Sequence, residues 1–179
     1  MLKILLISFC VLFTNFGKAN DIGSDTGFQI PRFVSLKSND VNLRIGSSTN
    51  YPIILKYTIK NLPVEIIDEQ DMWRKIMDID GNQGWIHKNL IKGDRYAIIK
   101  QPYKSPIQIF NKPNGKKIGL IGKRNIVKIK TCLKQWCLFD HKKKKGWINK
   151  KNLWGVYSYE KINVPFYQPL IDQFWKIKF

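Results

Sequence analysis

The sequence contains few of the residues on which catalysis and metal binding depend. Its 179 residues include only two histidines and three cysteines. Zinc hydrolases need clustered histidine and carboxylate ligands, and the His-Glu-x-x-His pattern is absent. Between residues 33 and 157, no stretch has the apolar stripe of a helix. These absences predict a protein that is not an enzyme and holds no metal or cofactor.

Acidic residues are also scarce. There are 13 of them against 31 lysines and arginines, and the formal net charge is +18. Such an imbalance predicts attraction to polyanions and says little about the fold. The longest apolar run, from Ile4 to Phe16, is shorter than the roughly 20 residues of a membrane-spanning helix.

The N-terminus has the features of a secretory signal peptide. Lys3 precedes the apolar run, and Gly17, Lys18 and Ala19 follow it as a small-x-small cleavage site. We therefore expect residues 1–19 to be cleaved after Ala19 and the protein to be exported, with an uncleaved N-terminal anchor as the alternative. Export makes cell-envelope polyanions the expected partners and argues against nucleic acid.

After cleavage, Cys132 and Cys137 are the only cysteine pair. An even count in an oxidising compartment favours a disulfide. The two residues flank an expected hairpin turn, across which facing Cα atoms lie roughly 4.5–5.5 Å apart. Two free thiols or a metal site are the alternatives. A structural zinc site requires four ligands, and His141 is the only further candidate ligand near the two cysteines in the sequence.

The chain repeats itself. Four matched pairs, each 62 or 63 residues apart, mark the repeat: Val64 and Val127, Trp73 and Trp136, Trp85 and Trp147, Leu90 and Leu153. A shared order of strand, Trp, strand and Gly-Trp-Ile at fixed spacing indicates a tandem duplication. Within each copy, apolar and polar residues alternate with the period of β-strands.

A hairpin turn is expected at residues 80–82, because Asp and Gly tolerate positive φ. Asp78, Asp80 and Asn82 superficially resemble a calcium loop. Gln83 and Asn89 stand where that loop requires Gly and Glu, so a polar turn is the favoured interpretation.

Residues 39–54 resemble the opening of a bacterial SH3 (SH3b) domain. The matching positions lie in this N-terminal segment and in the Gly-Trp-Ile motif near the end of the domain. They are Val41, Asn42, Leu43, Arg44, Gly46, Tyr51, Pro52, Gly84, Trp85, Ile86 and Leu90. The second copy is more diverged, with residues 107–110 in place of Val-Asn-Leu-Arg. The close at residues 153–157 also resembles tandem SH3-like proteins of Gram-negative bacteria, which often carry a cysteine on either side of this hairpin.

This resemblance implies an all-β fold: two tandem, partly open SH3-like barrels of five or six strands, sharing an interface because a 60-residue domain alone is marginal. We divide the chain into a signal peptide (1–19), a linker (20–32), module 1 (33–95), module 2 (96–157) and a tail (158–179). The tail has the pattern of a short helix after Pro169, which either docks on the modules or contacts a membrane surface as a peripheral element.

Trp85 and Trp147 are expected in the cores. The SH3 resemblance implies a groove lined by aromatics, for which Arg44, Tyr51 and Trp73 are the candidate ligand-binding residues. Lys142, Lys143, Lys144 and Lys145 form a candidate basic patch on module 2. We expect a periplasmic protein that binds cell-envelope material, peptidoglycan or its stem peptides. The alternative is an adaptor that binds an extended peptide.

Overall fold

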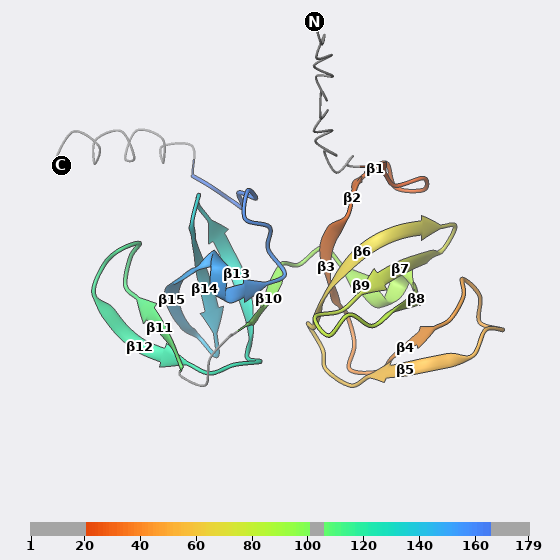
Figure 1. Ribbon diagram of the computed structural model, residues 1–179, viewed down its shortest axis with the longest axis horizontal. Coiled ribbons are helices and arrows are strands. Elements are labelled where there is room, and N and C mark those ends of the chain that lie inside the picture. Colours follow the sequence, from red (N-terminus) through yellow and green to blue (C-terminus); the bar gives the residue numbers. More distant parts are fainter. Residues whose placement is uncertain (1–20, 101–105, 166–179) are drawn as a thin grey trace, which may run out of the picture.

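The computed structural model describes residues 21–100 and 106–165. The expected signal peptide and the helix expected after Pro169 lie outside these ranges. Within them the fold is all-β, as predicted, and the two modules lie side by side (Figure 1). The only helices there are two 3₁₀ turns, η1 (Lys88–Leu90) and η2 (Lys150–Asn152). None of the helices in the described ranges is long and apolar enough to cross a membrane.

Module 1 is a seven-stranded antiparallel sheet. In sheet order its strands are β5 (Ile53–Tyr57), β4 (Val41–Arg44), β8 (Gln83–His87), β7 (Trp73–Met77), β6 (Pro63–Gln70), β3 (Arg32–Leu36) and β9 (Ile91–Lys92). Module 2 repeats this order with β12 (Lys117–Ile121), β11 (Ile107–Phe110), β15 (Lys144–Asn149), β14 (Trp136–His141), β13 (Ile126–Cys132), β10 (Tyr96–Ile99) and β16 (Leu153–Trp154). The two orders match strand for strand, so the duplication read from the sequence is present in the fold.

Each module has more strands than the five or six expected. The additional pairing comes from the two-residue strands β9 and β16, which pair with β3 and β10 respectively. Neither sheet closes on itself among the described strands, so β5 and β12 are free edges. The open, strongly bent sheets are consistent with SH3-like modules.

The core of each module comes from the inward residues of its alternating strands. Val64, Ile66, Ile76 and Ile86 are completely buried in module 1. Their counterparts Val127, Ile129, Phe139 and Ile148 fill module 2. Gly84 is required where β8 passes β4, because a Cβ there would lie 2.7 Å from the Arg44 carbonyl oxygen.

The segment expected as a linker contains a small hairpin of β1 (Asp21–Ile22) and β2 (Gln29–Ile30). Its turn covers Glu69 of β6, whose carboxylate accepts hydrogen bonds from the Thr26 backbone N–H at 3.0 Å and from the Thr26 hydroxyl at 2.8 Å. Arg32 and Arg74 form ion pairs with the same carboxylate. The segment is therefore fastened to module 1.

The two modules contact one another through rings and charged groups. The Phe33 ring of module 1 lies 5.0 Å from the Trp154 ring and 4.7 Å from the Tyr157 ring, measured between centroids. At another point of the contact, Arg124 forms two hydrogen bonds of 2.7 and 2.9 Å with the carboxylate of Asp80. The expectation that the modules share an interface is thus met.

Gly155 allows the chain to pass between the modules. Its φ is +111°, and a Cβ at this position would lie 2.7 Å from the Tyr96 carbonyl oxygen and 3.2 Å from Pro63 Cβ. Only glycine has both the conformational freedom and the small volume that this crossing needs.

The turn between β7 and β8 is the polar turn that we favoured over a calcium loop. Asp78 is buried, and its Oδ1 accepts hydrogen bonds of 2.9 Å from the backbone N–H groups of Asp80 and Asn82. Its Oδ2 accepts from the Asn82 amide at 2.8 Å and from the Tyr57 hydroxyl at 3.1 Å. The Asp78 carboxylate is thus used to hold the turn.

The disulfide between Cys132 and Cys137 is confirmed. The two residues face each other across β13 and β14, with a Cα–Cα distance of 4.1 Å, slightly shorter than we expected. Both are completely buried. Ile162 adds an isolated bridge to Cys132, with backbone hydrogen bonds of 2.8 and 3.1 Å. The disulfide hairpin therefore also anchors the start of the tail.

Candidate functional site

The outward side of β4, β7 and β8 carries most of the predicted ligand-binding residues of module 1. In the strand register Arg44 faces Trp85, Trp85 faces Lys75, and Trp73 faces His87. The Trp73 and His87 rings meet edge to face, with centroids 5.5 Å apart. We call Arg44, Tyr51, Trp73, Trp85 and His87 the first aromatic face.

Tyr51 joins this face from the loop between β4 and β5. The Arg44 guanidinium donates a 2.7 Å hydrogen bond to the Tyr51 backbone oxygen, which fixes the loop against the strand. The Tyr51 ring packs over Gly46, where a Cβ would lie 2.6 Å from the ring. The Tyr51 residue remains 48% exposed, so part of the ring is available to a ligand.

Arg44, Tyr51 and Trp73 therefore belong to one surface. Arg44 contacts Tyr51 directly, and β8 lies between Arg44 and Trp73. Within the same loop, the Ser47 hydroxyl donates a 2.7 Å hydrogen bond to the side chain of Gln70, which faces Trp73 in the register. The loop thus spans from Arg44 towards Trp73.

Module 2 repeats the surface with different chemistry. Phe110 takes the place of Arg44, and it faces Trp147 as Arg44 faces Trp85. The rings of Phe110 and Trp136 meet edge to face at 5.3 Å. We call Phe110, Trp136 and Trp147 the second aromatic face. Because Phe110 replaces the arginine, the second aromatic face lacks the guanidinium donors of the first.

The prediction that Trp85 and Trp147 are core residues is wrong. Both are only half-buried and point outward, whereas Ile86 and Ile148, the next residues in each strand, are completely buried. Alternation along a strand sends neighbours to opposite faces, so only one residue of each Trp-Ile pair can enter the core. The isoleucines occupy it, and the indoles become available at the surface.

The first aromatic face is suited to a ligand with both flat and anionic parts. The outward positions of β4, β7 and β8 carry no acidic residue: they are Asn42, Arg44, Trp73, Lys75, Met77, Gln83, Trp85 and His87. Half-exposed indoles stack against sugar rings or peptide planes. Arg44 and Lys75 favour carboxylates or phosphates in the same ligand.

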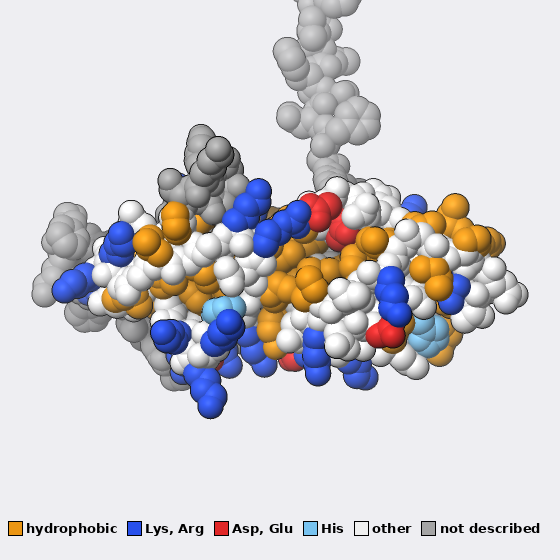
Figure 2. Space-filling view, turned by 90° about the horizontal axis from the view of Figure 1, so that it is seen from below, with side chains coloured by type: hydrophobic (Ala, Val, Ile, Leu, Met, Phe, Trp, Pro, Cys, Tyr) orange, Lys and Arg blue, Asp and Glu red, His pale blue; other side chains and the backbone are white. Residues whose placement is uncertain are grey.

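The predicted basic patch lies at the tip of the hairpin between β14 and β15. Lys142 and Lys143 form the turn with φ values of 51° and 65°, and Lys144 and Lys145 begin β15. All four are exposed. The patch belongs to a wider distribution, since Figure 2 shows Lys and Arg side chains over both modules and few acidic ones on this face.

Sequence reasoning missed the buried charge cluster around Glu69. Burial alone would raise the pKa of Glu69, but hydrogen bonds from Arg32 and Thr26 outweigh it and hold the pKa below its usual value. Lys150 is a second buried charge, and its pKa is lowered by burial. Its ammonium donates to the backbone oxygens of Ser158 and Glu160. No local sequence pattern marks these residues. Thr26 and Arg32 lie 43 and 37 residues before Glu69, and the partners of Lys150 lie 8 and 10 residues after it, beyond the period of a strand.

The fold and its aromatic faces define a class of protein: a tandem of SH3-like β-modules with solvent-facing aromatic strands. The sequence profile of the bacterial SH3 domain matches residues 37–93 and 121–155, about half of the chain. The chain therefore belongs to the bacterial SH3 domain family. The unmatched stretch between the two segments includes β11, where the second copy departs from the family pattern. No curated protein matches the chain.

Solved structures with similar folds include three larger proteins. A NlpC/P60 family protein from Bacillus cereus is 10% identical with a TM-score of 0.31, over 78% of this chain and 61% of that one. NlpC2 from Trichomonas vaginalis is 12% identical with a TM-score of 0.29, over 71% and 49%. NlpC1 from the same organism is 14% identical with a TM-score of 0.29, over 80% and 51%. This chain thus spans half to three fifths of those proteins, and at such TM-scores the likeness carries no inference about activity.

Proposed function

We propose that this protein is an exported, non-catalytic binding protein that recognises cell-envelope material, peptidoglycan or its stem peptides. The observation that carries the proposal is the first aromatic face, where Arg44 faces Trp85 and holds the Tyr51 loop, and Trp73 lies one strand further across the same surface. Peptidoglycan offers what such a face binds: sugar rings for the indoles and peptide carboxylates for the arginine. Membership of the bacterial SH3 domain family supports a binding role.

The test is retention of the mature chain on purified peptidoglycan sacculi at low and high salt. Replacing Trp73 by Ala removes an aromatic contact, so we expect affinity to fall about tenfold, as for a typical interface anchor. Phe28→Ala is the matched control, because Phe28 is an aromatic residue that is 65% exposed and is not part of the face. Equal retention of the wild type, Trp73→Ala and Arg44→Gln would overturn the proposal.

Matched variants of the second face show whether both modules bind. We expect Trp136→Ala to have a smaller effect than Trp73→Ala, because Phe110 replaces the arginine that fixes a carboxylate. Equal losses would assign the two faces equal shares of the binding.

A second candidate is an adaptor for an extended peptide, and the free edge strand β5 favours it. Ile53 and Ile54 on this strand are about half exposed, and they lie beside Tyr51. An unpaired edge accepts a peptide as an additional strand through main-chain hydrogen bonds. Backbone N-methylation of the peptide abolishes that mode of binding but leaves side-chain stacking on Trp73 in place, so it separates the two candidates.

The proposal includes periplasmic location and cleavage after Ala19. Its support is the N-terminal pattern of Lys3, apolar run and Gly-Lys-Ala. Mass spectrometry of protein from its native cells should find Asn20 as the first residue. An intact N-terminus on a cytoplasmic form would contradict the location and reopen nucleic acid as a partner.

A further inference from the structure

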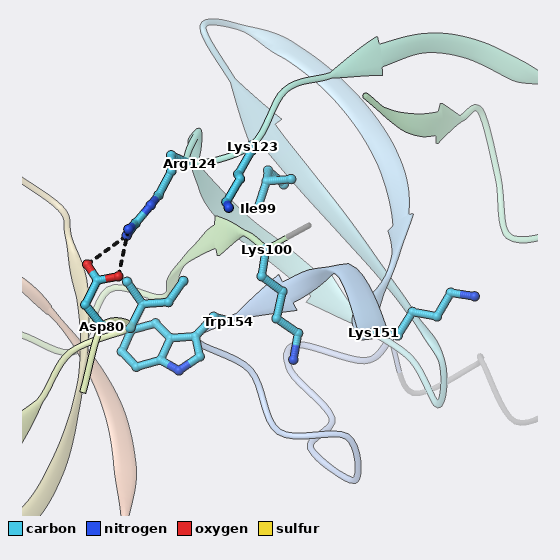
Figure 3. A pocket seen from close by; sticks show the side chains of 8 residues that line it. Asp80, Ile99, Lys100, Lys123, Arg124, Lys151 and Trp154 are labelled. Atoms are coloured by element: carbon cyan, nitrogen blue, oxygen red, sulfur yellow. Dashed lines mark hydrogen bonds and ion pairs between the residues drawn. The ribbon is translucent and has the colours of Figure 1, made fainter. Parts of the chain in front are cut away.

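A hollow of about 470 Å³ lies at the boundary between the modules. Both modules and several separate elements contribute its lining: Ile79, Asp80, Ile99, Lys100, Lys123, Arg124, Lys151 and Trp154. Ile79 and Asp80 come from the β7–β8 turn of module 1, whereas the remaining six residues come from module 2 (Figure 3). The hollow therefore exists only while the modules are docked.

The hollow is strongly cationic. Its single acid, Asp80, is already paired with Arg124 through two hydrogen bonds, which together with the nearby Lys123 hold the pKa of Asp80 below its usual value. The described ranges provide no ion-pair partner for Lys100, Lys123 or Lys151. Lys100 and Lys123 flank Ile99, and Lys151 lies at the outer rim (Figure 3). Three positive charges thus remain for a ligand.

The wall beside these lysines is apolar and packed against module 1. Trp154 is half-buried, and the Phe33 ring of module 1 holds it edge to face at 5.0 Å. Ile99 is completely buried behind the hollow. An indole fixed in this way offers an ordered surface to a flat ligand without a further loss of side-chain freedom.

We propose that this hollow binds an acidic sugar, with its carboxylate or phosphate between Lys100 and Lys123 and its ring against Trp154. The volume suits a small ligand, for which pockets of about 300–1,000 Å³ are usual. The charge requires an anion, and the indole favours a ring rather than a bare ion. The site uses none of the aromatic-face residues, so it is separate from the peptidoglycan surface proposed above.

Three related probes test the proposal by calorimetry on the mature chain: N-acetylmuramic acid, N-acetylglucosamine 6-phosphate and their neutral parent N-acetylglucosamine. We expect at least one of the acidic sugars to bind at least about tenfold more tightly than the neutral one, as one or two charge-assisted hydrogen bonds provide. The two acidic probes show whether the carboxylate or the phosphate is preferred. Equal binding of all three, or binding of none, would overturn the proposal.

Variants then locate the site. Lys100→Gln with Lys123→Gln should weaken binding of the preferred acidic sugar about tenfold. Lys37→Gln with Lys60→Gln makes the same charge change at two exposed lysines outside the hollow and should leave the affinity within about twofold. Trp154→Phe keeps a ring against Phe33 and should weaken the sugar probe more than inorganic phosphate. Equal losses in the two lysine pairs would show that net charge alone is responsible. Trp73→Ala should weaken retention on sacculi but leave the affinity for the acidic sugar unchanged. A failure of the peptidoglycan proposal can therefore be distinguished from a failure of the acidic-sugar proposal.

Discussion

The hydroxyl of Tyr157, at the end of module 2, donates a 2.6 Å hydrogen bond to the carboxylate of Glu65 in β6 of module 1. Glu65 is buried, and burial together with this hydrogen bond raises the pKa of Tyr157. We expect Tyr157→Phe to lower the free energy of unfolding by about 2 kcal/mol, because it leaves a buried carboxylate without this donor. Urea denaturation followed by tryptophan fluorescence measures the change.

Tyr159→Phe is the control for this variant. The Tyr159 ring stacks on that of Tyr157 with centroids 5.3 Å apart, but Tyr159 is 70% exposed. Removing its hydroxyl should therefore change the free energy of unfolding by no more than about 0.5 kcal/mol. If both variants unfold like the wild type, the Glu65 contact does not hold the modules together.

Glu69 should make the attachment of the N-terminal hairpin sensitive to acid. Its pKa is lower in the fold than in the unfolded chain, so its contribution is complete above the ordinary glutamate pKa of about 4.3 and is lost as the pH falls through the folded value. Glu69→Gln should cost about 3 kcal/mol at neutral pH, because Arg32 and Arg74 lose their buried partner. Unfolding measured between pH 7 and pH 3 should show a smaller acid dependence in the variant.

Asp40→Asn is the corresponding exposed control. Asp40 pairs with Lys56 at 3.1 Å, but both side chains are more than half exposed. Its loss should change stability by less than about 0.5 kcal/mol. A similar cost for the two substitutions would mean that the Glu69 cluster is no more than a surface ion pair.

Reduction of the Cys132–Cys137 disulfide should destabilise the protein by at most about 2 kcal/mol, since so short a loop removes little chain entropy. Replacing both cysteines by Ala should cost more than reduction does, because the buried sulfur atoms pack in the core of module 2. Denaturation of the oxidised, reduced and double-Ala proteins gives the three values. Equal stability of the oxidised and reduced proteins would contradict this prediction.

The lysine tip should contribute a salt-sensitive part of envelope binding. Substituting Lys142, Lys143, Lys144 and Lys145 by Gln should weaken retention on anionic envelope fractions at low salt and have little effect at high salt. Four exposed lysines spread over the protein, Lys37, Lys60, Lys88 and Lys161, provide a control with the same change in charge. If the two sets weaken retention equally, the cluster has no role beyond net charge.

Local patterns predicted the β-modules, their duplication, the Asp78 turn and the disulfide. In each case the signal lies within a few residues or in a fixed spacing, as between Trp73 and Trp136. The same patterns placed Arg44, Tyr51 and Trp73 on one surface through the family resemblance. The expectation that the large indoles of Trp85 and Trp147 fill the cores failed, because the strand period admits only one residue of each Trp-Ile pair.

Contacts between distant segments could not be predicted in this way. Thr26 meets Glu69 across 43 residues, and Tyr157 meets Glu65 across 92. Each residue is unremarkable in its own segment, and its role depends on how the modules are arranged in space. The hollow beside Trp154 has the same origin, since no single stretch of sequence contains its lining.

The contact between the modules uses unlike surfaces of two related folds. Phe33, Glu65 and Asp80 belong to the first, whereas Arg124, Trp154 and Tyr157 belong to the second, and the partners do not occupy matching positions of the repeat. The pair is therefore directional: each copy has been specialised for its own place in the order. A chain in which the two copies exchanged places would keep both folds but lose the contacts between the modules. The duplicated halves are therefore no longer interchangeable.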